Sequence, residues 1–226
     1  MLKYFSKKDI ALWVTSVLII AVSFFVFDRS NYMTLVASLI GVTSLIFCAK
    51  GNPVGQVLMI IFSTLYGYIS FSFAYYGEVA TYVGMTLPMA VFSLVSWLRN
   101  PYKGKKSEVE VNSVTKKEVA FMFALTAVVT IVFYFILQYF NTANLIPSTI
   151  SVTTSFAAAY LTFRRSPYFA LAYALNDLVL IVLWIMATVE DISYLSVIIC
   201  FAVFFINDIY GFISWQKMKK RQNYCQ

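Results

Sequence analysis

Long apolar runs joined by short connections constrain this chain more than any other feature of its sequence. Eight such runs can be delimited, at 9–27, 32–49, 53–76, 79–98, 117–139, 147–163, 167–189 and 192–215. A helix of about 20 apolar residues crosses the hydrocarbon core of a bilayer. Each run is therefore predicted to be a transmembrane helix, and the fold is predicted to be an all-α polytopic membrane protein with about eight spans.

The basic residues collect on one side of this arrangement. If the N-terminus is cytoplasmic, 16 of the 17 Lys and Arg residues lie in cytoplasmic segments, and only Arg29 lies outside. Because Lys and Arg favour the cytoplasmic side, both termini are predicted to be cytoplasmic. The same pattern accounts for the net charge of +7 without a nucleic-acid partner. The first run lacks a small-residue cleavage site, so it is predicted to be a retained helix and not a signal peptide.

Several classes of chemistry are excluded by residues and motifs that the sequence lacks. It has no histidine, which is the usual metal ligand and the usual proton relay near neutral pH. Its three cysteines, Cys48, Cys200 and Cys225, have no metal-site spacing and imply no disulfide framework. There is no nucleophile elbow, HExxH or Walker A motif. We therefore expect no catalytic residue, no metal and no cofactor, and the protein is predicted not to be an enzyme.

A weak internal repeat divides the predicted helices. Pro53 and Pro167 follow basic residues and lie 114 residues apart, and Trp97 and Trp215 close their runs 118 residues apart. A single linker helix between two three-helix units gives a 3+1+3 plan with parallel repeats, which favours transport over a purely structural role. The predicted divisions are an N-terminal peripheral helix at 1–30, a first repeat at 31–99, a cytoplasmic loop and linker helix at 100–141, a second repeat at 142–216 and a basic cytoplasmic tail at 217–226.

Two Asn-Asp pairs place ionisable groups inside the last two runs: Asn176-Asp177 and Asn207-Asp208. At 1.5 Å per residue, Asp177 lies about 15 Å and Asp208 roughly 10 Å from the cytoplasmic ends of their helices. A carboxylate inside a membrane helix is costly, so it usually faces a cavity or a pathway. The pairs are predicted to line one polar site. The alternative interpretation is a structural clamp between the two helices, and the two interpretations are compatible.

Other residues at similar depths are candidates for the same site. Asn offers a donor and an acceptor, a carboxylate accepts two hydroxyls of a diol, and an aromatic face stacks on a flat ring. A ribose with a planar base would use all three, and a cationic ring would add cation–π attraction. The Ser/Thr face at 148–155 is interpreted mainly as intrahelical bonding. Trp97 and Trp215 are predicted interface anchors, and Pro88 a kink.

Three stretches, taken in order with the span pattern, resemble the PnuC family of vitamin transporters: Ser63–Gly67, Asn176–Trp184 and Asn207–Trp215. The resemblance covers about residues 32–217. It implies a helical fold similar to SWEET sugar transporters, a bacterial inner-membrane location and a homotrimer. It also implies facilitated diffusion of nicotinamide riboside, which a cytoplasmic riboside kinase would trap by phosphorylation.

The family pattern and the polar groups together give one predicted site. By the resemblance, Asn176 and Asn207 hold the family's asparagine positions, and Gln56, Thr64, Trp184 and Tyr210 complete the pocket. The full predicted set of substrate-binding residues is Asn176, Asp177, Asn207, Asp208, Trp184, Tyr210, Tyr173, Gln56, Thr64 and Tyr66. In this interpretation both Asp208→Asn and Asn207→Ala abolish uptake.

Three alternatives stay open from the sequence. The first repeat reads Met89-Ala90-Val91-Phe92-Ser93 where relatives can carry an Asn-x-Tyr-Gly pattern, so the polar ligands are concentrated in the second half. The resemblance also extends to relatives that carry thiamine, riboflavin or deoxynucleosides, so each of these is an alternative substrate. A proton- or sodium-coupled transporter that uses Asp177 and Asp208 is a second alternative, and a membrane scaffold without transport is the third.

Overall fold

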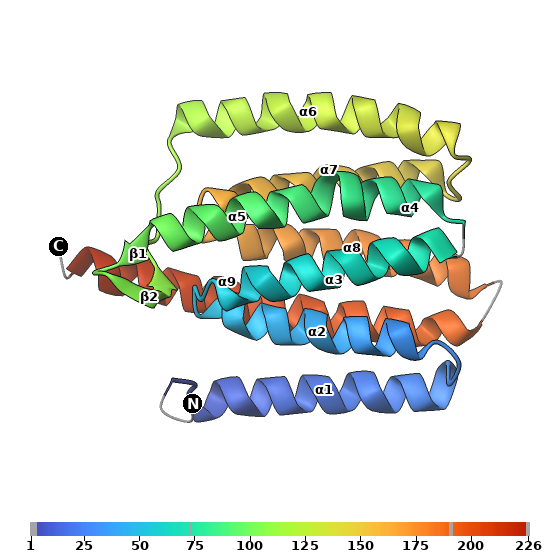
Figure 1. The fold of residues 1–226 in the computed structure, drawn as a ribbon, viewed down its shortest axis with the longest axis horizontal. Coiled ribbons are helices and arrows are strands. Elements are labelled where there is room, and N and C mark those ends of the chain that lie inside the picture. Colours follow the sequence, from blue (N-terminus) through green and yellow to red (C-terminus); the bar gives the residue numbers. More distant parts are fainter. Residues whose placement is uncertain (1–3, 73, 190–191, 225–226) are drawn as a thin grey trace.

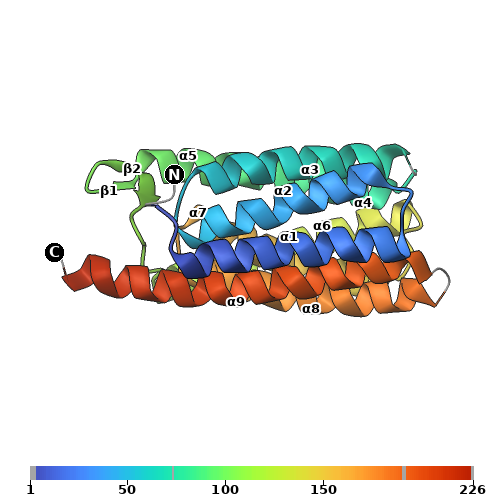
Figure 2. The same ribbon diagram turned by 90° about the horizontal axis from the view of Figure 1, so that it is seen from below.

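The computed structural model describes residues 4–72, 74–189 and 192–224, which form a bundle of long antiparallel helices (Figures 1 and 2). The elements in chain order are α1 (Lys7–Phe27), α2 (Tyr32–Ala49), α3 (Val54–Ser72), α4 (Tyr76–Thr81), a π-helical segment η1 (Tyr82–Thr86), α5 (Leu87–Arg99), β1 (Pro101–Tyr102), β2 (Lys105–Val109), α6 (Lys116–Tyr139), α7 (Leu145–Phe163), α8 (Tyr168–Thr188), a 3₁₀ turn η2 (Ile192–Tyr194) and α9 (Leu195–Tyr224). The start of α1 and the end of α9 lie at the same end of the bundle, beside the β-hairpin. We call this the hairpin end and the opposite one the far end.

The prediction that the apolar runs form helices is confirmed. The fourth run is divided, because a π-helical segment separates α4 from α5 immediately before the predicted kink at Pro88. Proline has no N–H and its ring clashes with the carbonyl four residues earlier, so the hydrogen-bond ladder widens there. The hydroxyl of Thr86 donates to the carbonyl of Thr81, five residues back, at 3.2 Å.

Among the described residues, seven helical segments are long and apolar enough to cross a membrane. The helix that does not meet this criterion is α7, which is rich in Ser and Thr and packs against α5, α6 and α8. Its surface is largely covered by protein, whereas α6 lies at the edge of the bundle with most side chains exposed (Figure 1). An interior helix needs fewer apolar residues than one that faces lipid. The number of spans stays a prediction.

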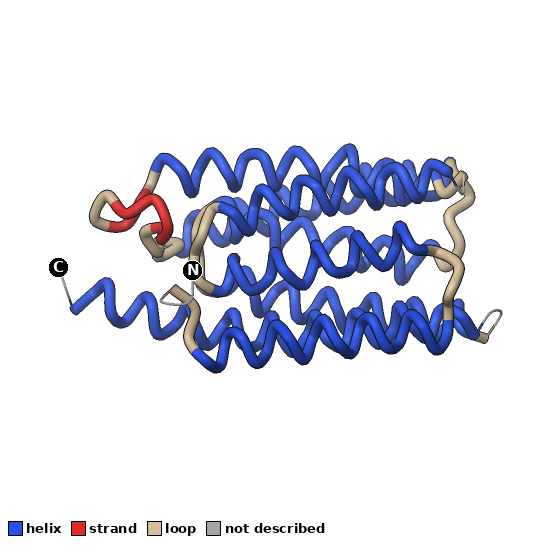
Figure 3. The backbone as a smooth tube through the Cα atoms, turned by 60° about the horizontal axis from the view of Figure 1, so that its bottom comes forward, coloured by secondary structure: helices blue, strands red, loops and turns tan. Residues whose placement is uncertain are grey.

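The connection between α5 and α6, expected to be a loop, contains a small antiparallel hairpin of β1 and β2 (Figure 3). Lys103 and Gly104 both have positive φ, +48° and +74°, as a tight two-residue hairpin turn requires. From the last residue of β2 onward, backbone N–H groups donate to carbonyls of two helix–helix turns. Val109 N–H bonds the carbonyl of Gly51 at 2.9 Å, and Asn112 N–H bonds that of Arg165 at 3.0 Å. Residues 108–112 therefore cross the hairpin end of the bundle, and we call this segment the strap.

Helix α9 continues to Tyr224, so the basic segment predicted as a tail is helical as far as that residue. Gln222, which is almost fully buried, holds this extension to the strap. Its Oε1 accepts from the N–H of Val111 at 2.8 Å, and its Nε2 donates to the carbonyl of Val109 at 3.1 Å and to Oε1 of Glu108 at 2.9 Å.

Gln222→Ala should therefore destabilise the strap. The variant leaves buried donors and acceptors unpaired, and the expected loss is about 1–3 kcal/mol. The measurement is the thermal unfolding midpoint of purified protein in detergent. Arg221→Ala is the matched control, because the Arg221–Glu108 ion pair is exposed on its Arg221 side and should contribute little. Equal midpoints for the two variants would contradict the assigned role of Gln222.

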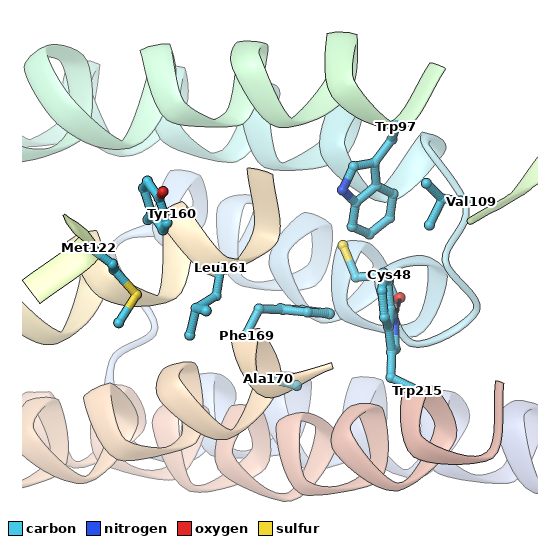
Figure 4. Close-up of a cluster of buried hydrophobic side chains, with 9 residues drawn as sticks. All are labelled: Cys48, Trp97, Val109, Met122, Tyr160, Leu161, Phe169, Ala170 and Trp215. Carbon is cyan, nitrogen blue, oxygen red and sulfur yellow. Dashed lines mark hydrogen bonds between the residues drawn. The ribbon is translucent and has the colours of Figure 1, made fainter. Parts of the chain in front are cut away.

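Two indole rings close the hairpin end of the bundle. Trp97 and Trp215 are fully buried, so they are not the interface anchors predicted from their positions near helix ends. Their ring centroids lie 5.4 Å apart, and Phe169 packs against Trp215 at 4.9 Å (Figure 4). Trp97 Nε1 donates to the carbonyl of Thr162 at 2.9 Å, and Trp215 Nε1 donates to that of Cys48 at 2.7 Å. We call this the tryptophan layer.

Candidate functional site

A cavity of about 120 Å³ lies among α2, α3, α4, η1, α6, α7, α8 and α9, on the far-end side of the tryptophan layer. It is large enough for several water molecules. Apolar side chains such as Met59, Phe62 and Phe204 form much of its wall. Its polar lining consists of Glu78, Thr81, Tyr82, Thr86, Ser148, Ser151, Ser155, Tyr173, Asn176, Asp177 and Asp208. An apolar cleft with a few convergent polar groups is the usual form of a small-molecule site.

Asn176 is held in a fixed orientation by the Ser/Thr face of α7. Its Oδ1 accepts from the hydroxyls of Ser151 at 3.2 Å, Thr154 at 2.8 Å and Ser155 at 3.0 Å. Three hydroxyl donors identify this atom as the amide oxygen and leave the amide N–H groups as the donors available to a ligand. The Ser/Thr face, interpreted from sequence mainly as intrahelical bonding, therefore also orients a cavity residue.

Asp177 and Asp208 face each other across the α8–α9 contact and are both almost fully buried. Each carboxyl group lines the cavity, and the two are close enough to influence each other's charge. Asp177 Oδ2 is buried and has no partner among the described residues. No Lys or Arg is among the described residues that line the cavity. Two buried carboxyl groups this close share a proton unless a cation is bound beside them.

Six of the ten predicted site residues do not line this cavity. Asn207 faces α1, where its Nδ2 donates to Ser16 Oγ at 2.9 Å and to the carbonyl of Val203 at 2.8 Å. Tyr210 lies on the same side and donates its hydroxyl to Asp9, which also pairs with Lys50 at 2.6 Å. Consecutive helix residues are about 100° apart, so Asn207 and Asp208 face different neighbours.

The other four lie in separate packing contacts. Gln56 donates to Cys48 Sγ at 3.3 Å, and Thr64 is exposed and bonds its own helix. The ring of Tyr66 stacks on Tyr82 with centroids 5.1 Å apart, so it lies behind the cavity wall. Trp184 packs on Tyr194 near the far end, also at 5.1 Å.

Sequence reasoning missed the contribution of the fourth run. Glu78, Tyr82 and Met85 of this run line the cavity, and none of them is among the site residues predicted from sequence. Glu78, Thr81, Tyr82 and Met85 follow i, i+3, i+4 and i+7 spacing, which marks one helix face. That spacing was the signal from which these cavity residues could have been predicted. It is easily missed because Glu78 lies at the start of the run, where it also fits an outer connection between two helices.

Comparisons with known proteins all match transporters. Residues 31–217 match a family described as nicotinamide mononucleotide transporter. The chain is 24% identical to the nicotinamide riboside transporter PnuC of Neisseria mucosa over 94% of this chain and 82% of the relative. It is 21% identical to the protein of the same name from Haemophilus influenzae, over 93% and 91% of the two chains. A crystal structure of the vitamin B3 transporter PnuC matches with a TM-score of 0.81 and 23% identity, covering 96% of this chain and 94% of that one.

Proposed function

This chain belongs to the nicotinamide mononucleotide transporter family, and we propose that it carries nicotinamide riboside across the membrane by facilitated diffusion. The family consists of transporters and not of enzymes. The family description names the mononucleotide, whereas the names of both relatives give the riboside. The two molecules differ by a phosphate group, and the chemistry of the cavity distinguishes them.

The charge of the cavity carries the proposal. Its charged lining residues are Glu78, Asp177 and Asp208, with no Lys or Arg among the described lining residues. A phosphate dianion would face three carboxyl groups without a cation, which is electrostatically unfavourable. The riboside is a cation through its pyridinium ring, so it would be attracted by the same groups. Riboflavin and deoxynucleosides lack this charge, and thiamine shares it.

The polar groups fit the rest of the riboside. A carboxylate of the Asp177–Asp208 pair accepts the two ribose hydroxyls, and the amide N–H groups of Asn176 donate to the carboxamide oxygen or a ribose oxygen. Tyr173 and Tyr82 supply aromatic faces at the cavity wall for the pyridinium ring. Binding of the cation beside the two aspartates would replace the shared proton or accompany its loss.

Two parallel three-helix repeats with SWEET-like architecture, α2–α5 and α7–α9, would provide the moving parts. Positions 114 residues apart support the repeat: Gly51 and Arg165 both have positive φ, +64° and +56°. The backbone carbonyls of Cys48 and Thr162, also 114 residues apart, each accept a hydrogen bond from the indole N–H of the tryptophan in the other half. Rocking about this shared layer would open the cavity alternately at each end. Helix α6 would be the linker and α1 a peripheral addition.

The hairpin end is proposed to be cytoplasmic, in a bacterial inner membrane. Nearly all Lys and Arg residues of the sequence belong to segments at this end, as the positive-inside rule requires. A cytoplasmic riboside kinase would trap the substrate, because the phosphorylated product does not fit the acidic cavity. A homotrimer rests on the resemblance, with the exposed apolar faces of α1 and α6 facing either lipid or a second copy.

Uptake of radiolabelled nicotinamide riboside into liposomes with purified protein tests the function. We expect equilibration without an ion gradient, competition by unlabelled riboside and none by the mononucleotide. Thiamine, riboflavin and thymidine serve as further competitors. Block by one of these, with no uptake of the riboside, would reassign the substrate to that competitor.

Proton-coupled transport is a second candidate, favoured by the unpartnered Oδ2 of Asp177 beside Asp208. In that case the shared proton would move with the substrate cycle in a fixed ratio. An inward proton gradient would then drive accumulation above the external concentration. Uptake that reaches the same final level with and without the gradient would exclude coupling.

A further inference from the structure

Glu78 occupies a defined place at the far-end side of the cavity. It is the third residue of α4, is partly buried and lines the cavity together with Thr81 and Tyr82. The preceding Gly77 packs so closely on the α6–α7 connection that an added Cβ would lie 2.1 Å from Thr142 Oγ1. The backbone at the start of α4 is therefore held in place by its close contact with the side chain of Thr142, and this contact fixes the backbone position of the neighbouring Glu78.

The carboxylate of Glu78 has no cation to balance it among the described residues. The ion pairs found among the described residues are Asp9–Lys50, Glu118–Arg164 and Glu108–Arg221, and all three lie toward the hairpin end. Arg29, the one basic residue at the far end, donates to the carbonyl of Phe25 on its own helix. A partly buried carboxylate without a partner is unfavourable and attracts a cationic ligand.

Glu78 and the aspartate pair lie at different depths. Counted along nearly parallel helices at 1.5 Å per residue, Glu78 is about 3 Å from the far-end terminus of α4. Asp177 and Asp208 are about 16 Å and about 20 Å from the far-end termini of α8 and α9. Both aspartates line the same cavity, so they form the deeper of its two acidic positions.

We propose that Glu78 is a specificity-determining residue on the access side of the cavity, which selects cationic over neutral substrates before they reach Asp177 and Asp208. This inference rests on the proposed function. A cation that enters from the far end meets Glu78 first, beside the ring of Tyr82, and then passes to the aspartate pair. A neutral molecule of the same shape gains nothing from the carboxylate.

The test compares two ribosides of nearly the same shape. Nicotinamide riboside is a cation, and its dihydro form is neutral. Transport of each is measured in zwitterionic phosphatidylcholine liposomes by wild type and by Glu78→Gln, which removes the charge and keeps the side-chain length. We expect Glu78→Gln to lower the uptake efficiency of the cation about tenfold and that of the neutral form less than twofold, because steering fields act on charge.

Asp28→Asn is the matched control. Asp28 is a far-end acidic residue that accepts a hydrogen bond from the Ser30 hydroxyl and does not line the cavity that contains Glu78, so this variant should change the uptake of neither substrate. Ionic strength gives a second measurement that requires no variant to fold. Wild-type uptake of the cation should fall with added salt, and this dependence should be weaker in Glu78→Gln.

The outcomes separate the inference from the function. Selective loss of the cation with Glu78→Gln supports the role of Glu78. Equal loss of both substrates, or no loss, overturns it while the transport function stands. If Glu78→Gln is unstable, a salt-independent wild-type rate for the cation also overturns it. If wild type transports neither riboside, the proposed function fails and this inference fails with it.

Discussion

Asp208→Asn is expected to reduce uptake of nicotinamide riboside about a hundredfold while the protein stays folded. Asn207→Ala is expected to destabilise the protein and to leave uptake nearly unchanged. The two residues are consecutive on α9 but face different surroundings. Asp208 lines the cavity beside Asp177, and Asn207 bonds Ser16 on α1. Removing one member of a buried charge pair with a ligand costs about 2–5 kcal/mol in binding, and 1.4 kcal/mol corresponds to tenfold.

The order of the two variants should be reversed for stability, with Asn207→Ala the less stable one. Asn is nearly isosteric with Asp, and its amide N–H can donate to Asp177 in place of the shared proton, so the unfolding midpoint of Asp208→Asn should match that of wild type. Asn207→Ala leaves the Ser16 hydroxyl without its donor and removes the bond to Val203, at a cost of about 1–3 kcal/mol. Once folded, it should transport at a rate within a few fold of wild type.

Uptake and thermal midpoint in detergent are measured on the same preparations. Ser16→Ala is the companion variant, because it removes the partner of Asn207 from α1 without touching α9. It should resemble Asn207→Ala in stability and wild type in uptake. If Asn207→Ala abolishes uptake at an unchanged midpoint, the residue binds substrate as the family pattern implies, and its contact with α1 in this conformation is secondary.

The sequence was most informative where local pattern determines structure. Apolar runs of membrane length predict helices because every backbone polar group must be paired within the segment in lipid. The end of the second run and the beginning of the third, around Gly51, agree with α2 and α3 to one residue. The hairpin was missed because its stability comes from contacts distant in sequence, such as Val109 with Gly51 and Glu108 with Gln222.

The site was predicted only in part because a sequence does not fix the rotation of each helix. Asp177 and Asp208 were found from the cost of burying charge, which holds for any rotation. Asn207 and Tyr210 were equally polar and close in sequence, but α1, outside the matched family region, supplies their partners Ser16 and Asp9. A polar residue in a membrane helix predicts a protein neighbour, and which neighbour depends on tertiary packing.

Trp97 and Trp215 are expected to be the most sensitive positions for stability and for closure of the hairpin end. Truncation of either to Ala should cost about 3–5 kcal/mol, because a large buried ring is lost from a packed cluster. The more informative variants are Trp97→Phe and Trp215→Phe. They keep an aromatic ring in the layer and remove the indole N–H that bonds Thr162 or Cys48 of the other half.

Cys48 reports on the opening of this layer directly. Its thiol is buried beside Trp215, and in a Cys200→Ser, Cys225→Ser background it is the remaining thiol of the chain. In the Phe variants, the rate at which a maleimide modifies Cys48 should rise about fivefold, since one hydrogen bond of about 1 kcal/mol no longer holds the closed state.

Trp13→Phe is the matched control, because the Trp13 indole also donates a hydrogen bond, to Thr43, but at an exposed position on α1. Its Cys48 modification rate should equal that of the background protein. If Trp97→Phe and Trp215→Phe also leave the rate unchanged, the reciprocal indole bonds do not control access, and rocking about the tryptophan layer loses its principal support. If both raise it to the same extent, the two halves contribute equivalent contacts to one closure, as parallel repeats require.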